Sequence, residues 1–307
     1  MTTETGACKP RILFIGRATL DVLYRLDTLP EEDTKAYARA FHAAPGGPAV
    51  NAAITHALLG GVSLLITALG QGMAAAAVRR ELNRLGIQLL DLADGSAYEA
   101  PLSTVLLSAA TSSRTIVNPP ISSVPLRRLT GSWAAEVPAA WAAPPPVALC
   151  DGFHLNETLP LLAACRAAGT ALCLDGGSWK PLTAELAPLL TAAICSERFR
   201  VPGQESGPEA TLAWFAAQGV PFAAVTRGAK PIFGSDRGRR FAIEIEPIDA
   251  ADTLGAGDVL HGAFCHFFAL TGQFEPSLRR AAQIATLSCR SLGVEAWAHH
   301  PPQSPAR

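Results

Sequence analysis

The segment DTLGAGDVLHGAF, residues 252–264, combines two glycines, a carboxylate and the start of an apolar helical pattern. Gly255 and Gly257 permit a tight turn that points several backbone N–H groups at one spot where a helix begins, and this arrangement binds anions. Asp258 then stands where a phosphate would be bound. A carboxylate repels a phosphate, so its presence makes sense if it accepts a proton from a hydroxyl that attacks that phosphate. The structural alternative is an aspartate that caps a helix after a tight turn.

A second glycine-rich segment, PGGPAVNAA at residues 45–53, leads into another apolar helical pattern. Its glycines would let a ligand approach the backbone closely, and Asn51 in the first turn could hydrogen-bond that ligand. The alternative is a helix start that carries an asparagine on its surface. The segment is therefore a candidate binding site, with both interpretations open.

A third segment, GQGMAA at residues 70–75, follows a predicted strand and opens a predicted helix. With Asp91 about 20 residues further on, it matches the dinucleotide pattern G-x-G-x-x-A. Because the segment follows the second strand rather than the first, the match is weak, but an NAD-dependent dehydrogenase remains one alternative. The sequence contains no G-x-x-x-x-G-K-[ST] motif, which excludes a P-loop nucleotide hydrolase on the motif.

Alternating strands and helices would position these segments. Short apolar runs at 11–16, 62–70, 147–152, 170–177, 192–196 and 222–228 are typical of buried strands. Stretches rich in Ala and Leu at 49–60, 74–86, 158–169 and 209–219 have helical spacing and end in glycine. This alternation predicts an α/β fold in which a parallel sheet is covered by helices on both faces.

Two stretches interrupt the alternation, at residues 21–45 and 98–118. Neither has helical periodicity, and the second has apolar runs on both sides of a Ser/Thr turn, which is the pattern of a hairpin. We expect them to form a small antiparallel sheet that covers a crevice at the carboxyl ends of the main strands. The expected organisation is a single domain over residues 1–298 with inserts at about 21–45 and 98–118, followed by a tail at 299–307.

The composition limits the partners of the protein. The chain has 307 residues, of which 49% are hydrophobic and 17% charged, and its formal net charge is −1. The near-zero charge argues against nucleic acid as a partner. No apolar run approaches the roughly 18 residues of a membrane helix, and the start of the chain lacks the apolar region of a signal peptide. We therefore expect a cytoplasmic protein without membrane partners, whose seven scattered cysteines are free thiols.

The string DTLGAGD followed by HGAF closely resembles the C-terminal signature of the ribokinase-like (PfkB) carbohydrate kinases. Further segments match this family in the expected order over nearly the whole chain. They are the stretch from Gly16 to Asp21, PGGPAVNAA, a hairpin containing Arg114, DGGSWK at 175–180, TRGA at 226–229, and a last helix ending at Gly293.

The resemblance implies a Rossmann-like three-layer fold with a small β lid, and transfer of the ATP γ-phosphoryl group to a sugar hydroxyl with Mg²⁺ and possible use of K⁺. It implies that Asp258 is the general base. The implied anion hole consists of the backbone N–H groups of Gly255, Ala256 and Gly257. The implied sugar ligands are Asp21, Gly46, Gly47, Asn51 and, from the lid, Arg114. The implied nucleotide contacts are Thr226, Gly228 and Thr253, and Asp252 matches a residue that helps to hold a monovalent cation.

The chain departs from the family pattern at three places. Many relatives have G-D-D-x-x-G where this chain has GQGMAA, so both carboxylates are missing. The N-x-x-E segment, which helps to arrange Mg²⁺, appears as Ser196–Phe199 with Glu197 shifted. His261 stands where many relatives have asparagine, and a role in core packing or on the helix surface, rather than in catalysis, is expected for it.

The acceptor stays open between a ketose, ribose, a keto-deoxy sugar acid and a modified fructose. A nucleoside kinase of the same fold is the nearest alternative, and a non-catalytic sugar sensor is a further one. Relatives often dimerise through the lid, so a homodimer is plausible.

Overall fold

A nine-stranded sheet forms the centre of the computed structural model, which describes residues 9–111, 113–120, 122–291 and 293–299. The strands from one edge to the other are β13 (Arg239–Ile243), β12 (Lys230–Asp236), β11 (Phe222–Arg227), β10 (Ala192–Ser196), β9 (Ala171–Gly176), β8 (Val147–Cys150), β1 (Arg11–Ile15), β4 (Val62–Thr67) and β5 (Gln88–Asp91). Neighbouring strands from β11 to β5 are parallel, and β12 and β13 are added antiparallel at one edge.

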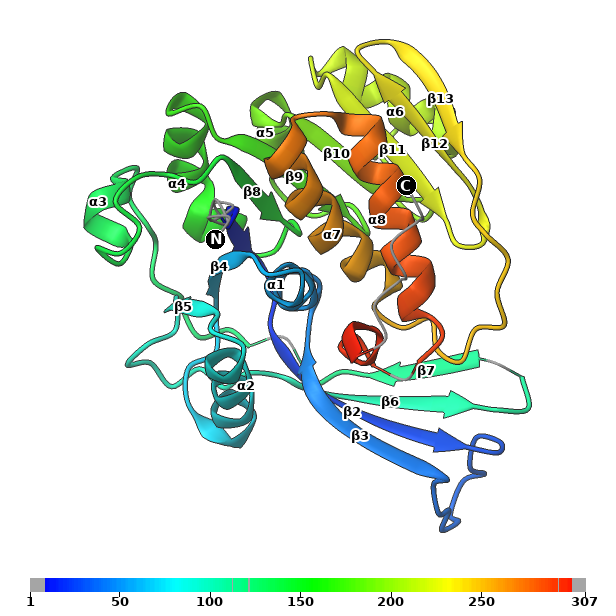
Figure 1. Ribbon diagram of the computed structural model, residues 1–307. Helices are drawn as coiled ribbons and strands as arrows, with labels where there is room; N and C mark the ends of the chain where they lie inside the picture. The colour runs from blue at the N-terminus through cyan, green and yellow to red at the C-terminus, as the bar shows by residue number, and fades with distance from the viewer. Residues whose placement is uncertain (1–8, 112, 121, 292, 300–307) are drawn as a thin grey trace, which may run out of the picture.

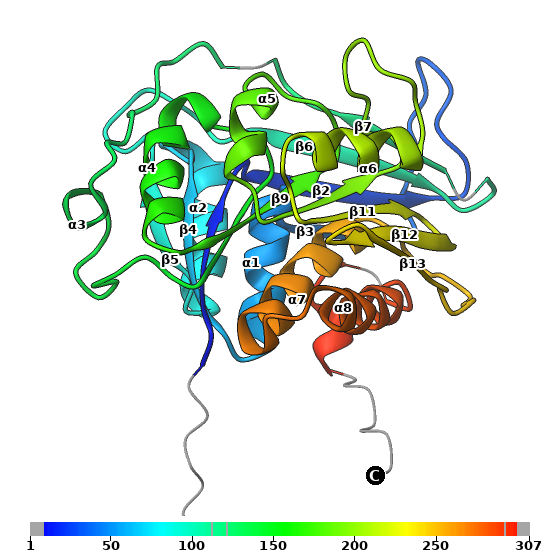
Figure 2. The ribbon, with the colours of Figure 1, turned by 90° about the horizontal axis from the view of Figure 1, so that it is seen from above.

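Helices cover both faces of this sheet, as Figure 2 shows. On one face lie α1 (Pro48–Leu58), α2 (Gly72–Arg84), α7 (Ala256–Thr271) and α8 (Phe274–Ser288), whose buried side chains share one apolar cluster. On the other face lie α3 (Trp133–Glu136), α4 (Leu155–Ala167), α5 (Thr183–Leu186) and α6 (Pro208–Ala217), which share a second cluster. Two short 3₁₀ helices are η1 (Ala187–Leu189) and η2 (Ala296–His299). The expected α/β fold is confirmed, because strands buried on both faces need this double cover.

A second sheet stands apart from the central one (Figure 1). It contains β3 (Ala40–Gly46), β2 (Thr19–Leu26), β6 (Leu102–Ser108) and β7 (Ser113–Val117), in the order β3-β2-β6-β7. The pairs β2–β3 and β6–β7 are antiparallel, whereas β2 and β6, which join the two pairs, run parallel. The parallel pairing arises because the two pairs come from separate parts of the chain, with β4 and β5 between them.

The sequence patterns did not indicate every element. The strands β5 and β12 were not expected, because QLLD is only four residues long and KPIFGSD contains Pro and Gly, which weaken a strand pattern. Among the described helices, none is long and apolar enough to cross a membrane. The expected tail lies mostly outside the described residues, since 300–307 are not among them.

The order of the central strands determines where a ligand can bind. From β1 the chain proceeds to β4 and β5 on one side, and later to β8, β9, β10 and β11 on the other side. The loops that follow β1 and β8 therefore diverge at the carboxyl edge of the sheet. In open α/β sheets this switch point forms the ligand-binding crevice.

Candidate active site

The start of α7 is an open helix N-terminus. Gly255 precedes the helix with φ 75°, and an Oδ1 atom of Asp252 accepts a hydrogen bond from the N–H of Leu254 (2.8 Å). Within the described residues, the N–H groups of Gly257 and Asp258 have no protein acceptor. A Cβ atom placed on Gly257 would meet nothing within 4 Å. The predicted tight turn before α7 therefore exists, and that it binds a phosphate stays a prediction.

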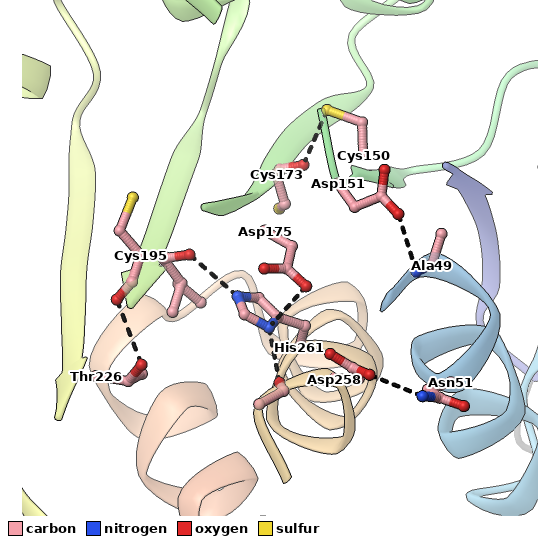
Figure 3. Close-up of polar contacts among 12 residues, drawn as sticks. Ala49, Asn51, Cys150, Asp151, Cys173, Asp175, Cys195, Thr226, Asp258 and His261 are labelled. Atoms are coloured by element: carbon pink, nitrogen blue, oxygen red, sulfur yellow. Dashed lines mark hydrogen bonds and ion pairs between the residues drawn. The ribbon is translucent and has the colours of Figure 1, made fainter. Parts of the chain in front are cut away.

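Asp258, in the first turn of α7, faces Asn51 of α1 across the crevice (Figure 3). The Asn51 side-chain amide donates a hydrogen bond to Asp258 Oδ2 (2.7 Å). Burial, and next the negative charge of Asp175, raise the pKa of Asp258 to about 7. Asn51 Oδ1 is buried and has no hydrogen-bond partner among the described residues. An orphaned buried acceptor beside a carboxylate is the environment that a hydroxyl-bearing ligand would complete.

Sequence reasoning did not assign a role to Asp175, and it expected only a packing role for His261. Asp175 lies near the end of β9, and its Oδ2 atom is 3.3 Å from Nδ1 of His261. The same Nδ1 atom is 2.7 Å from the Gly257 carbonyl, and Nε2 is 3.0 Å from the Ile194 carbonyl of β10. His261 thereby fixes the first turns of α7 against β10. The packing role is confirmed, and it includes positioning the anion-binding turn.

Asp21 on β2 lies at the junction of the second sheet with the crevice. It accepts a hydrogen bond from Thr19 Oγ1 (2.6 Å), and burial raises the pKa of its carboxyl. A Cβ atom on Gly46 would lie 2.1 Å from Asp21 Oδ2, so only glycine fits there. Gly47 has φ 99°, and a Cβ atom on it would lie 2.2 Å from the Arg17 carbonyl oxygen. The two glycines thus let β2 and α1 approach each other at the site.

Asp151, which follows β8, was also missed by sequence reasoning. One of its oxygens accepts the N–H groups of Arg17 (2.9 Å) and Ala49 (3.3 Å), and the other accepts the N–H of Phe153 (2.9 Å). A Cβ atom on Gly16 would lie 2.1 Å from this carboxylate. Burial raises the pKa of Asp151 to about 7. Asp151 therefore joins the loops after β1 and β8 to the start of α1.

The expected nucleotide residues lie on the other side of α7. Thr226, near the end of β11, donates through Oγ1 to the Cys195 carbonyl of β10 (3.3 Å). Gly228 forms the turn after β11 with φ 63°. Thr253 is exposed in the loop before α7. These positions are at the same carboxyl edge, two strands from Asp175 in the order β11-β10-β9.

Arg114 is not brought into this cluster. It is exposed on β7 and pairs with Leu107 of β6, whereas Asp21 pairs with Ser103. Four residues along a strand correspond to about 13 Å. The family resemblance placed Arg114 in the sugar site, but the register of β6 and β7 carries it toward the tip of the second sheet.

The carboxylate of Asp252 is committed to the backbone. Its oxygens accept the N–H groups of Leu254 (2.8 Å) and Gly293 (3.4 Å). Among the described residues, no group of three His, Cys, Asp or Glu side chains could hold a metal ion. A divalent ion that enters with a nucleotide is commonly bound mainly by phosphate oxygens and water.

The dinucleotide interpretation of GQGMAA was wrong. Asp91, which would hold the ribose in that interpretation, instead accepts the N–H groups of Leu69 (2.9 Å), Gly70 (3.0 Å) and Ala93 (2.9 Å). It also pairs with Arg79 of α2. With these four contacts, its carboxylate stabilises the turn after β4 and is not available to a ribose.

Comparison with known proteins places this geometry in a family. The chain matches the model of the pfkB family carbohydrate kinases over residues 9–300. Ribokinase from Bacillus subtilis (strain 168) is 22% identical over 295 residues, which cover 92% of this chain and 94% of that protein. A ribokinase-like structure from Agrobacterium tumefaciens has a TM-score of 0.78 at 26% identity, with 94% of each chain covered. Arabidopsis thaliana ribokinase, solved with ribose and ATP, has a TM-score of 0.71 at 20% identity, again with 94% of each chain covered. Because the family model spans nearly the entire chain and the fold agrees, this protein belongs to the PfkB family of carbohydrate kinases, which are phosphotransferases acting on sugar hydroxyls.

Proposed function

We propose that this protein transfers the γ-phosphoryl group of ATP to a hydroxyl of a small sugar or sugar acid, at the crevice between α7 and the second sheet. The observation that carries the proposal is the pairing of Asp258 with the open N-terminus of α7. A carboxylate with a raised pKa lies beside free N–H donors and the orphaned oxygen of Asn51. A proton acceptor, an anion site and a hydroxyl site are therefore adjacent.

In the proposed reaction, Asp258 accepts the proton of the sugar hydroxyl as its oxygen bonds to the γ-phosphorus. The bond from that phosphorus to the β–γ bridging oxygen breaks, and ADP leaves. The N–H groups at positions 255–257 stabilise the transferred phosphoryl group, which needs positioning and neutralisation more than covalent help. Asp21 and Asn51 Oδ1 accept hydrogen bonds from other sugar hydroxyls. Closure of the second sheet as a lid excludes water that would otherwise hydrolyse ATP.

Cations complete the proposed site. Mg²⁺ bound with ATP would supply positive charge that neutralises the phosphates. We assign K⁺ to the loop around Asp252. The bound cation would hold the residues that precede α7 in their observed conformation. Carboxylate contacts to Leu254 and Gly293 already connect this loop to the segment after α8.

The test is a coupled assay of ADP release with Mg·ATP and K⁺ present, over ketoses, ribose, keto-deoxy sugar acids and nucleosides. The proposal expects one sugar or sugar acid to raise ADP release far above the rate without acceptor. A nucleoside as the best acceptor would move the protein to nucleoside phosphorylation on the same fold. ATP binding without any acceptor-dependent ADP release would instead support a sugar sensor.

The second sheet also supports a homodimer. By strand register, Val22 and Tyr24 of β2 share one face with Phe41 of β3 and Val117 of β7, and this face is opposite to that of Asp21. Phe41 and Val117 are 61% and 57% exposed. A second copy of the chain would cover this apolar face. Sedimentation of the wild type and of Phe41→Ser tests this, since the variant should shift toward monomer.

A further inference from the structure

Two cations converge on one aromatic ring beside the proposed sugar site. The Arg17 guanidinium carbon lies 5.4 Å from the centre of the Phe153 ring, and Lys180 Nζ lies 4.7 Å from it. Arg17 follows β1, Phe153 follows β8, and Lys180 follows β9. Three neighbouring strands therefore bring these groups together at the carboxyl edge of the sheet.

Neither cation is in direct contact with a carboxylate among the described residues. Neither Arg17 nor Lys180 forms an ion pair there, and the Lys180 ammonium bonds only to Ser178. The nearby carboxylates have other partners: Asp151 accepts three backbone N–H groups, and Asp175 faces His261. Burial lowers the pKa of Lys180, although the negative charges of Asp151 and Asp175 oppose this, so the ammonium gains from an anionic ligand in direct contact.

The backbone holds both cations in place. The Arg17 N–H is fixed by Asp151. The Lys180 N–H donates to Thr183 Oγ1 (3.2 Å), and Thr183 Oγ1 donates back to the Lys180 carbonyl (2.8 Å). A Cβ atom on Gly152 would lie 2.9 Å from Lys180 Cγ, so the lysine stem lies across this glycine. The backbone of both residues is therefore held where their side chains meet the Phe153 ring.

Arg17 and the aromatic ring of Phe153 border a large cavity. Arg17, Phe153 and His154 line a cavity of about 770 Å³ together with the start of β6 and the start of α2. The helix α4 begins immediately after His154, so its positive N-terminal dipole adds to the cationic field. Glu99 also lines this cavity and does not pair with Arg17. Arg17 therefore lines open space that could hold a charged substituent. Its positive charge also lowers the pKa of the Asp21 carboxyl, against the larger effect of burial, so Arg17 lies within electrostatic reach of the proposed sugar site.

We infer that the acceptor sugar carries a second, anionic group, a carboxylate, sulfonate or phosphate, which Arg17 and Lys180 bind while Asp258 faces the hydroxyl to be phosphorylated. This inference rests on the proposed function and narrows its substrate class to sugar acids and their analogues. Neutral ketoses and nucleosides lack a group that could neutralise the pair.

The experiment uses a series of acceptors that differ only at carbon 6. D-Fructose is the neutral member, and D-fructuronate, 6-deoxy-6-sulfo-D-fructose and D-fructose 6-phosphate carry a carboxylate, a sulfonate and a phosphate. The acid 2-keto-3-deoxy-D-gluconate presents the carboxylate at the other end of the chain. ADP release gives kcat/KM for each, and calorimetry gives the binding constant of each without nucleotide. The member with the highest kcat/KM identifies which anion the pair accepts.

We expect an anionic member to exceed fructose in kcat/KM, and Arg17→Gln or Lys180→Gln to lower this preference by roughly 10- to 100-fold, mainly through KM. Arg17→Lys, which keeps the charge, should recover part of the preference. Arg280→Gln is the matched control, because Arg280 lies over the Phe267 ring with its guanidinium carbon 4.0 Å from the ring centre and is on the remote helix α8. It should leave the preference unchanged.

The outcomes separate this inference from the proposed function. Fructose as the best acceptor, or equal losses for neutral and charged acceptors in Arg17→Gln, would overturn the anion site while leaving the kinase intact. If no acceptor raises ADP release but an anionic sugar binds the wild type more tightly than it binds Arg17→Gln, the proposed function fails and the anion site stands. If no anionic sugar binds more tightly than fructose, the anion site is refuted whatever the turnover.

Discussion

At the scale of single residues, Asp258 joins two demands that conflict. In the proposed reaction it must lie beside a phosphate, which its negative charge opposes, and it must be able to take a proton. The pKa of about 7, raised by burial and by Asp175, reduces this conflict because the proton affinity of the carboxylate matches neutral conditions. The Asn51 side-chain amide donates to Asp258 Oδ2 and so fixes the orientation of this carboxylate.

For Asp258→Asn we expect kcat to fall by roughly 10²- to 10⁴-fold while the ATP dissociation constant changes only a few-fold. Wild-type kcat/KM should rise with pH through about 7, since the base works only when deprotonated, and this limb should vanish in the variant. If the residual activity of the variant still rises with pH through about 7, the titrating group is Asp151, because burial raises the pKa of Asp151 to about 7 as well. The control is Asp249→Asn, which makes the same substitution at an exposed residue of a nearby loop.

Asp21 gives a second test at this scale. Asp21→Ala should weaken sugar binding by roughly 10- to 100-fold, because a charge-assisted hydrogen bond is lost, and should change ATP binding much less. Calorimetry with each ligand separately measures both constants. Equal losses of sugar and ATP affinity would mean that Asp21 acts by holding β2 against Gly46 and not by contacting the sugar.

At the scale of elements, the two glycines at the start of α7 have different reasons to be glycine. Gly255 has φ 75°, and a Cβ atom on it would lie 2.6 Å from Val294 Cγ1. Gly257 has no such constraint, because a Cβ atom on it would meet no protein atom within 4 Å. The first glycine therefore serves the fold of the turn, whereas the second keeps the helix N-terminus open to its ligand.

This difference predicts opposite effects for one substitution at the two positions. Gly255→Val should lower the free energy of unfolding by about 2 kcal/mol or more, from backbone strain and the clash with Val294. Gly257→Val should leave the thermal midpoint nearly unchanged and reduce kcat/KM for ATP at least tenfold. Thermal unfolding and ADP release on both variants provide the comparison. A destabilised Gly257→Val with normal ATP kinetics would contradict this division of roles.

At the scale of the whole molecule, a buried histidine pair connects α1, α7 and the segment before β1. His56 Nε2 is 3.1 Å from the Pro10 carbonyl, which can only accept, so that nitrogen carries the hydrogen. His56 Nδ1 must then accept from His266 Nδ1, at 3.1 Å. Burial lowers the pKa of His56 to about 3 and that of His266 to about 4, so both are neutral in the folded protein.

Acid should therefore destabilise the fold through this pair. In the unfolded chain both histidines bind protons below about pH 6.5, whereas in the folded chain they do not until about pH 4. The free energy of unfolding is therefore unaffected by protonation of the two histidines above pH 6.5 and decreases as the pH falls below it. His56 alone should lower it by up to about 2 kcal/mol between pH 7 and pH 5. Urea unfolding at pH 7 and at pH 5 measures the free energy of unfolding. It should fall more for the wild type than for the double variant His56→Gln/His266→Gln. A difference between the two proteins that is the same at both pH values would refute this. Asp151 and Asp258 have raised pKa values and act in the opposite direction, but they are present in both proteins.

The sequence by itself determined the local features of this protein. Alternating apolar runs and helical stretches predicted the parallel sheet and its two helix layers, because a strand that is buried on both faces needs a continuous run of apolar residues. The string DTLGAGD predicted an anion-binding turn followed by a carboxylate, since both depend only on adjacent residues. The second sheet was predicted from the two segments that lacked helical periodicity.

Only the tertiary structure decided which distant side chains meet. Asn51 and Asp258 are 207 residues apart in the chain, and Asp151 joins segments more than a hundred residues away. The convergence of Arg17, Phe153 and Lys180 depends on β1, β8 and β9 being neighbours, which follows from strand order and has no local signature. Strand register likewise decided that Arg114 lies four residues along the second sheet from Asp21. Sequence patterns depend on residues that are close together in the chain. The proposed site is formed by contacts between the ends of strands that are far apart in the chain, so local patterns do not predict it.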